Sequence, residues 1–397
     1  MTRATLLAFA LALVVPGVVR AQPETHGAHA FTTWSPGNVL LDAHSTPVSV
    51  YYPTDGGGPF PLVAVVHGAS ETMATMAEMA RTLASRGFVA ITPTIDCGFT
   101  GCNHTHNAAE VRQLLDWGVA QSADASTPIA GLVDGELRGV IGHSWGGLAV
   151  FLAAQGYPEI DAVVVLDAND DSGIAAAAAP SVTQPSAHLM AEVMGACNST
   201  NWKDTVFPGT PSPHMRVVVT GAAHCDAEDP EDSLCPLVCT AGAGASVAPY
   251  FRRYAVAFMG CVLQADTSMA PWIGGAQLTA DTSANLVQYV STAGLDTLPC
   301  NGGTLPDAGP LPDAGPLPDA GTTANDAAAT HDAGSGIDAA SAIDVGAAID
   351  AGGTSTSGGC GCRAGGAAPS RSAWLFALVV IGLAARRRAR VVYAADA

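Results

Sequence analysis

Three side chains with the chemistry for nucleophilic acyl transfer follow apolar runs of strand length. Ser144 comes three residues after such a run, Asp167 comes directly after one, and His224 follows another through a short glycine-alanine link. A serine hydroxyl is a weak nucleophile by itself, so it needs an adjacent base and a carboxylate that orients the base. The sequence therefore predicts Ser144 as nucleophile, His224 as base and Asp167 as acid.

The local sequence around Ser144 is the run GHSWGG, residues 142–147. A Gly-x-Ser-x-Gly pattern presents a serine on a sharp strand-to-helix turn, where side chains at Gly142 and Gly146 would collide with the neighbouring strand and helix. The pattern alone is weak evidence in a glycine-rich chain. Its position between an expected strand, 139–141, and an expected helix, 148–155, predicts a nucleophile elbow.

The acid has alternatives. Asp167 is favoured because it ends the strand that follows the nucleophile helix. Asp170 and Asp171 lie just behind it, and Glu192 follows the next strand along the chain. Sequence alone leaves these three carboxylates open.

The tetrahedral intermediate of acyl transfer needs donors for its oxyanion, typically two backbone N–H groups. The expected pair is the N–H of Trp145, next to the nucleophile, and that of Ala69, which follows the strand ending at His67 and Gly68. The Trp145 indole is expected either to line the acyl pocket or to pack on the sheet. The histidines at positions 104, 106 and 214 are expected at the surface, with His104 or His106 lining the site as the alternative.

Strands and helices alternate along the chain. Strands are expected at 47–52, 62–66, 88–95, 139–141, 162–166, 187–191 and 215–219, and helices at 71–86, 108–119, 148–155 and 247–263. This alternation predicts an α/β fold with a mostly parallel sheet, helices on both faces, and active groups at the carboxyl ends of the strands. The order Ser, Asp, His is that of α/β-hydrolases. The inter-strand segments hold no insertion long enough for a large lid.

Four segments differ in composition. Residues 1–21 have the layout of a secretory signal peptide, residues 22–300 hold the expected catalytic domain, and residues 301–359 form a linker. The linker contains three copies of Leu-Pro-Asp-Ala-Gly and neither Lys nor Arg, so it cannot bury a core. Residues 360–397 form a C-terminal tail.

The C-terminal tail consists of a Cys-Gly-Cys group, an apolar run at 373–385 and an arginine cluster. The apolar run is shorter than the roughly 20 residues that span a bilayer. This order resembles the sorting tail called MYXO-CTERM. The resemblance implies contact with sorting machinery, transient membrane contact, and a protein that ends at the cell surface or is released; a permanent membrane anchor is the alternative.

Charge limits the partners of the expected catalytic domain. Residues 22–300 contain 8 Lys plus Arg and 26 Asp plus Glu, a net charge of 8 − 26 = −18. Nucleic-acid binding requires a basic surface, so it is not expected. A neutral substrate fits this charge better.

Ten cysteines in an exported chain indicate disulfides. Cys97 and Cys102 are expected to pair across a short loop. The cysteines at 197, 225, 235, 239, 261 and 300 leave fifteen connectivities open, and a bridge from Cys225 would hold the His224 loop. No phosphate loop or dinucleotide fingerprint follows any strand, and no partner pair at metal-ligand spacing accompanies Cys235 and Cys239, so neither cofactor nor metal is expected.

The chain resembles the dienelactone-hydrolase-like, lidless esterase branch of the α/β-hydrolases, which includes polyester hydrolases, chlorophyllases and platelet-activating-factor acetylhydrolase. The resemblance covers about residues 47–275 and rests on PLVAVVHG (61–68), LASRGFVAITP (83–93), GHSWGG (142–147), LDA (166–168) and GAAHCD (221–226). The acetylhydrolase and chlorophyllase members imply Asp167 as acid, and the polyester hydrolases imply Glu192. Polyester hydrolases carry an aromatic residue at the position of Ala69 and Met at that of Trp145.

These observations predict a secreted or cell-surface, monomeric carboxylic-ester hydrolase that acts on a small-molecule, lipid or polymer ester. An inactive binding or adhesion protein on the same fold is a second hypothesis, because fold alone does not determine function. An acyltransferase or peptidase with the same triad is a third.

Overall fold

The computed structural model describes residues 22–98, 101–198, 201–291 and 293–304. The expected signal peptide, the C-terminal tail and nearly all of the linker lie outside these residues. Within them, no helix has the length and apolar character that crossing a membrane requires.

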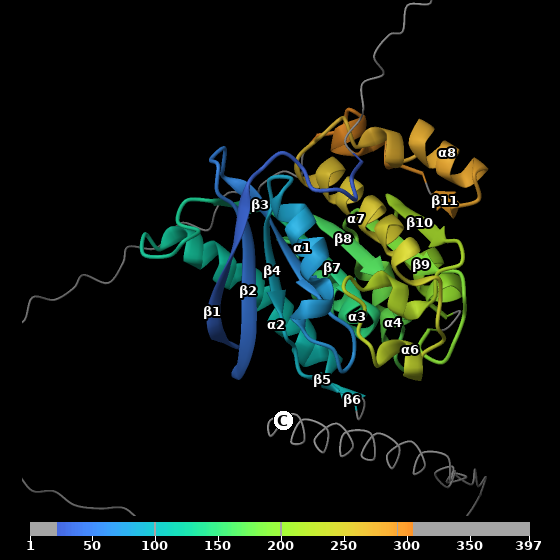
Figure 1. Ribbon diagram of the computed structural model, residues 1–397, viewed down its shortest axis with the longest axis horizontal. Coiled ribbons are helices and arrows are strands. Elements are labelled where there is room, and N and C mark those ends of the chain that lie inside the picture. The colour runs from blue at the N-terminus through green and yellow to red at the C-terminus, as the bar shows by residue number, and fades with distance from the viewer. Residues whose placement is uncertain (1–21, 99–100, 199–200, 292, 305–397) are drawn as a thin grey trace, which may run out of the picture. The chain divides into compact units, whose positions relative to one another are not determined.

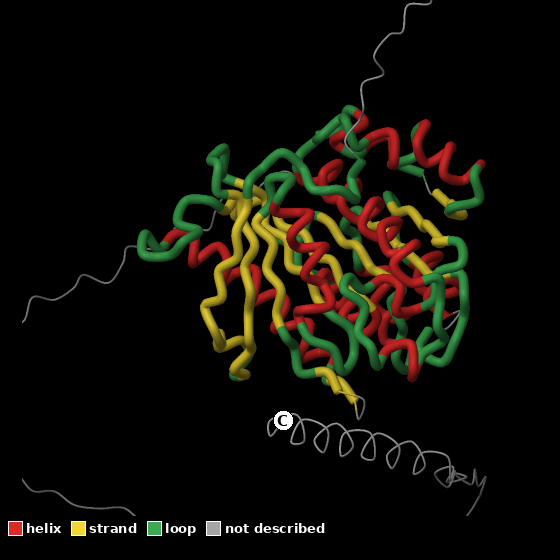
Figure 2. The backbone as a smooth tube through the Cα atoms, viewed as in Figure 1, coloured by secondary structure: helices red, strands yellow, loops and turns green. Residues whose placement is uncertain are grey.

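A nine-stranded sheet forms the centre of the fold, in the order β1-β2-β4-β3-β7-β8-β9-β10-β11 (Figures 1 and 2). Its strands are β1 Phe31–Leu41, β2 His44–Pro53, β3 Phe60–Val66, β4 Val89–Pro93, β7 Val133–His143, β8 Ala162–Leu166, β9 Ser186–Ala191, β10 His214–Val219 and β11 Val287–Ser291. The pairs from β4 to β10 are parallel, whereas β1, β2 and β11 pair antiparallel at the two edges. A small hairpin, β5 Cys97–Gly98 and β6 Gly101–Cys102, stands apart. The fold is that of an α/β-hydrolase.

Helices cover both faces of the sheet. They are α1 Ala77–Ala84, α2 His104–Ala123, α3 Ser144–Ala154, α4 Ile174–Ala178, α5 Phe207–Gly209, α6 Cys235–Val238, α7 Ala248–Leu263 and α8 Ala276–Ser283. The period-two alternation of β3 explains the two layers, because successive side chains of a strand point to opposite faces. Val63 and Val65 pack with α1 and α7, whereas Leu62 and Ala64 pack with α2 and α3.

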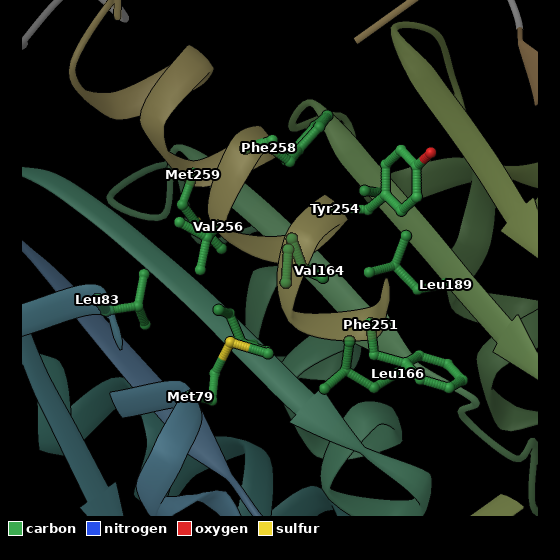
Figure 3. Close-up of a cluster of buried hydrophobic side chains, with 14 of the residues drawn as sticks. Met79, Leu83, Val164, Leu166, Leu189, Phe251, Tyr254, Val256, Phe258 and Met259 are labelled. Atoms are coloured by element: carbon green, nitrogen blue, oxygen red, sulfur yellow. The ribbon is translucent and has the colours of Figure 1, made fainter. Parts of the chain in front are cut away.

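The core beneath α7 is continuous with the carboxyl ends of the strands. Phe251, Tyr254 and Phe258 of α7 pack with Val164 of β8 and Leu189 of β9 (Figure 3). All five side chains are buried. This packing fixes the strand ends from which the candidate site is built.

Several element boundaries differ from expectation. The helix expected at 71–86 is a short 3-10 turn, Met73–Met76, followed by α1, because Thr72 has extended backbone and caps the turn by accepting the N–H of Ala74. Helix α2 begins four residues before its expected start, since Asn103 caps it by accepting the N–H of His106. Strands β1 and β11 were not expected; β1 contains Pro36 and Gly37, where its register with β2 shifts.

Candidate active site

Ser144 stands at the sharp turn between β7 and α3. Its backbone is left-handed, with φ of 53°. A Cβ at Gly142 would lie 2.3 Å from the carbonyl oxygen of Gly146, and a Cβ at Gly146 would lie 2.1 Å from that of His67. Only glycine at both positions allows the strand and helix to approach closely enough for this turn.

Ser144, His224 and Asp167 are hydrogen-bonded in series. The Ser144 Oγ lies 2.8 Å from His224 Nε2, and His224 Nδ1 lies 2.7 Å from Asp167 Oδ2. His224 and Asp167 are buried, and Ser144 is 7% exposed. In this geometry the imidazole accepts from the serine hydroxyl and donates to the carboxylate, which is the arrangement needed to activate a serine.

Further donors hold the Asp167 carboxylate. The backbone N–H of Ala191 donates to Oδ1 at 2.9 Å, and the side-chain amide of Asn198 donates to Oδ2 at 2.9 Å. Burial raises the pKa of Asp167, but His224 and these donors outweigh it and hold the pKa below its usual value. Sequence reasoning missed Asn198, which lies in a loop without any motif.

The other candidate acids have different partners. Glu192 accepts the backbone N–H of Gly221 at 2.8 Å and also bonds to a side chain of β11. Asp170 accepts two N–H groups at the start of α4. Asp171 pairs with His104 at 3.1 Å. The structure therefore brings Asp167, rather than one of these three, to His224.

Ala69 and Trp145 line the same pocket as Ser144. The N–H of Trp145 belongs to the first turn of α3, where a helix has no intrahelical acceptor. The loop before Ala69 is held by Glu71, whose carboxylate accepts the Gly68 N–H at 2.9 Å. A Cβ at Gly68 would come within 3.0 Å of the Ser144 Cβ, so this loop lies close against the nucleophile.

A buried group of ionisable side chains lies behind the triad. The His143 Nδ1 lies 3.5 Å from a Glu71 oxygen and 3.8 Å from a Glu228 oxygen, and His143 Nε2 donates to the carbonyl of His224 at 3.0 Å. His143 thereby connects the loop before Ala69 to the backbone of His224. Sequence reasoning treated His143 only as the variable residue of the elbow.

The charges in this group are coupled. Burial lowers the pKa of His143, but Glu71 and Glu228 outweigh it and raise the pKa to about 9. Burial and the neighbouring Glu71 raise the pKa of Glu228 to about 9, whereas His143 holds the pKa of Glu71 well below its usual value. At neutral pH the group therefore contains an imidazolium, one carboxylate and one neutral carboxylic acid.

The pocket beside Ser144 is mostly apolar. Two exposed side chains, Leu234 and Val238, come from the segment of α6. The lining also includes the half-buried indole of Trp145, whose ring packs against that of His104 at 5.4 Å between centroids. Trp145 thus lines the pocket, the first of its two expected placements.

The predicted surface positions of three histidines were wrong. His104 and His214 are buried rather than exposed, and His106 is largely buried. His104 packs under Trp145, and His214 packs among the aromatic side chains of the core near Phe207. Their surroundings depend on which residues of other elements cover them, which local sequence does not specify.

Disulfides stabilise the loops of the site. Within the described part of the chain, four bridges are present: Cys97–Cys102, Cys197–Cys239, Cys225–Cys235 and Cys261–Cys300. Cys225 adjoins His224, and its bridge ties the histidine loop to α6. The sulfurs of Cys225, Cys235 and Cys239 lie close together, but all three belong to disulfides and so are not metal ligands in this oxidised form.

The chain is similar to a known family over part of its length. The PET hydrolase-like family matches residues 41–193, a segment that includes Ser144 and Asp167 and ends before His224. This segment is less than half of the chain.

Three relatives illustrate the similarity. Cutinase cut1 of Thermobifida fusca is 29% identical over 181 residues, covering 41% of this chain and 53% of the relative. Cutinase 2 of Thermobifida cellulosilytica is 29% identical over 150 residues, covering 33% and 55%. A bis(hydroxyethyl) terephthalate hydrolase of Streptomyces coelicolor (strain ATCC BAA-471 / A3(2) / M145) is 30% identical over 119 residues, covering 30% and 36%. The chain thus spans about half the length of the cutinases that it matches.

Proposed function

We propose that this protein is an exported serine esterase that hydrolyses carboxylic esters through an acyl-enzyme. The observation that carries the proposal is the hydrogen-bonded series Ser144–His224–Asp167 beside an apolar pocket. The names of the similar proteins, cutinases and a bis(hydroxyethyl) terephthalate hydrolase, support ester bonds as the target.

The first half-reaction acylates the serine. Ser144 Oγ attacks the ester carbonyl carbon while His224 Nε2 takes the hydroxyl proton, and Asp167 stabilises the resulting imidazolium. The N–H groups of Ala69 and Trp145 donate to the oxyanion. The tetrahedral intermediate then expels the alcohol, which receives its proton from His224, and the acyl group stays on Ser144.

The second half-reaction restores the enzyme. His224 takes a proton from a water molecule as the water attacks the acyl carbonyl, and the same two N–H groups stabilise the new oxyanion. Collapse of this intermediate breaks the bond to Ser144, whose oxygen recovers the proton from His224. The products are a carboxylic acid and an alcohol.

The pocket favours an ester that is neutral and at least partly apolar. Leu234, Val238 and Trp145 supply apolar surface on different sides of Ser144. The expected domain carries a net charge of −18, which disfavours anionic substrates. A small-molecule, lipid or polymer ester satisfies both conditions.

Export is part of the proposal. The signal-peptide layout of residues 1–21 and the four disulfides support an oxidising location outside the cytoplasm. The tail at 360–397 supports sorting to the cell surface, with release or anchoring as its two outcomes. We further expect a monomer.

Covalent labelling tests the enzyme and its nucleophile. A fluorophosphonate probe is expected to label the full chain, with no labelling of Ser144→Ala and strongly reduced labelling of His224→Ala. Absence of labelling in the correctly folded wild type would favour the binding-protein hypothesis. Labelling that persists in Ser144→Ala would place the nucleophile elsewhere.

Substrate series test the ester class. We expect hydrolysis of p-nitrophenyl esters, and Leu234→Ser should raise KM more for longer acyl chains than for acetate. Leu40→Ser is the matched control, because Leu40 is an exposed leucine on β1 that does not line the pocket. Faster turnover of matched amides, or of acyl transfer to an added alcohol, would instead favour a peptidase or acyltransferase.

A further inference from the structure

Three potential metal ligands lie together where the β1–β2 hairpin meets α2. His44 begins β2, and His106 and Glu110 are one helical turn apart on α2. One ligand atom from each side chain lies within 4.8 Å of those of the other two. These residues play no part in the proposed ester chemistry.

Glu110 is the most buried member of this group. It is 1% exposed, and its Oε1 accepts a hydrogen bond from the Thr46 hydroxyl at 2.6 Å. Its Oε2 is also buried but has no hydrogen-bond partner among the described residues. A buried carboxylate oxygen without a donor is costly unless a cation compensates it.

His106 faces the free oxygen of Glu110. Its Nδ1 lies 2.5 Å from Asp42 Oδ2, so Nδ1 carries the proton and donates to the carboxylate. In the neutral imidazole with its proton on Nδ1, the lone pair is on Nε2. Nε2 lies 3.7 Å from Glu110 Oε2 and has no hydrogen-bond partner in the described part of the chain. A carboxylate that orients a histidine in this way is the usual outer partner of a metal-binding imidazole.

His44 completes the group from the hairpin. Its ring centroid lies 4.0 Å from that of His106, and its side chain is exposed. The two-residue turn before it has left-handed backbone at both positions, with φ of 44° at Asp42 and 66° at Ala43. Left-handed backbone is unfavourable for alanine, and here it brings Asp42 and His44 to the same helix.

We propose that His44, His106 and Glu110 bind a divalent transition metal ion, with zinc as the expected occupant and Asp42 as the residue that orients His106. Two imidazole nitrogens and one carboxylate oxygen suit zinc, whereas calcium and magnesium prefer oxygen ligands alone. Zinc bonds of about 2.0–2.1 Å at tetrahedral angles place neighbouring ligand atoms about 3.3 Å apart. The separation of 3.7 Å between His106 and Glu110 requires only a small movement.

The ion would connect two separate elements. It would tie the end of the β1–β2 hairpin to the first turns of α2, where the backbone N–H of Asp42 already donates to Gln113 at 2.6 Å. Three protein ligands leave the fourth tetrahedral position to a water molecule. The expected consequence is higher stability of the folded chain when zinc is bound.

Zinc titration of the chelator-stripped full chain, produced without a polyhistidine tag, tests the proposal. Competition with a chromogenic chelator should give one saturable zinc site per chain, and zinc should raise Tm. Cobalt should bind in place of zinc and give the d–d absorption of a tetrahedral site. Calcium and magnesium should leave Tm unchanged.

Variants separate this site from nonspecific binding. His44→Ala alters an exposed side chain and should fold normally, yet bind zinc at least tenfold more weakly. Asp42→Asn should bind about 10- to 100-fold more weakly, as expected for the loss of an orienting carboxylate. The control is His29→Ala, which removes a histidine paired with a single carboxylate, Asp55, at 2.8 Å and should leave zinc binding unchanged.

Two results would overturn the proposal. One is the absence of saturable zinc binding by the wild-type chain, which would make His106 and Glu110 an ordinary ion pair. The other is zinc binding of equal strength in wild type and His44→Ala. Both measurements are independent of ester hydrolysis, so they hold whether or not the proposed esterase activity is found.

Discussion

Ser144 and Asp167 both have left-handed backbone, with φ of 53° and 43°. Such conformations cost on the order of 1–3 kcal/mol for a residue other than glycine, so the surrounding structure must hold them. At Ser144 the close approach of Gly142 and Gly146 does so, and at Asp167 the carboxylate is held by Ala191 and Asn198. The strain lies at the two residues whose side chains meet His224 from different strands.

Replacement of the acid tests this geometry. Asp167→Asn should lower kcat/KM for an ester by about three to four orders of magnitude, because the amide neither holds neutral His224 in the tautomer with its proton on Nδ1 nor stabilises its protonated form. Glu192→Gln should change kcat/KM only a few-fold, since Glu192 bonds to Gly221 and β11. Steady-state kinetics of both variants show which carboxylate is the acid. A larger loss of kcat/KM in Glu192→Gln than in Asp167→Asn would refute the assignment of Asp167.

The Glu71–His143–Glu228 group predicts a dependence of stability on pH. The pKa of His143 in the folded protein is raised from 6.5 to about 9. The stabilisation that protonated His143 gives to the folded state is therefore fully present below pH 6.5 and is lost as pH rises through 9. The pKa of Glu228 is raised from 4.5 to about 9, so the stabilisation by protonated Glu228 is also lost as pH rises. The free energy of unfolding should therefore fall between pH 7 and 10, by about 3 kcal/mol from His143 alone.

Denaturant unfolding at several pH values measures this fall. Glu228→Gln mimics the neutral acid and should make the decline with pH shallower. Glu159→Gln, at an exposed carboxylate, is the control and should follow the wild type. A wild-type stability that is constant from pH 7 to 10 would contradict the proposed charge state.

At the scale of elements, the short helix α6 forms a wall of the pocket through covalent attachment. Cys235 at its start is bonded to Cys225 beside His224, and Cys239 just after its end is bonded to Cys197. Asp226 also accepts three backbone N–H groups, which fixes the histidine loop to the segment after α6. The apolar side chains of α6 are exposed, so packing alone would hold it weakly.

Removing one of these bridges should affect stability and catalysis together. The double substitution Cys225→Ser and Cys235→Ser opens a loop of sequence separation 10 and should cost about 3 kcal/mol of unfolding free energy. It should also lower kcat/KM, because His224 loses its covalent neighbour. Thermal unfolding and ester kinetics of the same preparation measure both effects.

The Cys261–Cys300 bridge provides the matched control. Its sequence separation is 39, so Cys261→Ser with Cys300→Ser should cost about 4 kcal/mol. Because neither residue lines the pocket, the folded variant should retain near-normal Michaelis parameters. Equal kinetic losses in the two double variants would show that the effect on catalysis is not local to the His224 loop.

At the scale of the whole molecule, acidic charge dominates the field around the pocket. The net charge of −18 between residues 22 and 300 should repel anionic substrates over distances set by ionic strength. The Debye length falls from about 30 Å at 0.01 M to about 10 Å at 0.1 M salt. Added salt should therefore weaken the repulsion without altering the pocket.

Ester pairs of matched size test this effect. The kcat/KM for an ester with a remote carboxylate should rise several-fold between about 0.01 M and 0.1 M salt, as screening increases. The value for a neutral ester of the same length should change little. If salt changed kcat/KM equally for both esters, long-range repulsion would be excluded as the cause of the salt effect.

Much of the fold was predictable from local patterns. The apolar runs 62–66 and 162–166 and the glycine-flanked Ser144 specify strands and a turn through steric and hydrophobic effects among near neighbours. The edge strands β1 and β11 were not predictable, because Pro36 and Gly37 interrupt the pattern of β1, and β11, Val-Gln-Tyr-Val-Ser, lacks a continuous apolar run. The predicted start of the first helix was wrong, because Thr72 has extended backbone.

For the candidate site, the residue types and the order Ser144, Asp167, His224 follow from the sequence alone, because each comes after a strand and parallel strands end at one edge of a sheet. Which carboxylate reaches His224 was decided by tertiary structure, as Asp167 and Glu192 both follow strands but meet different donors. Tertiary structure likewise decided which residues surround His143 and brought His44 close to Glu110. The members of these two groups come from elements distant in the chain, and only packing brings them within a few ångströms of each other.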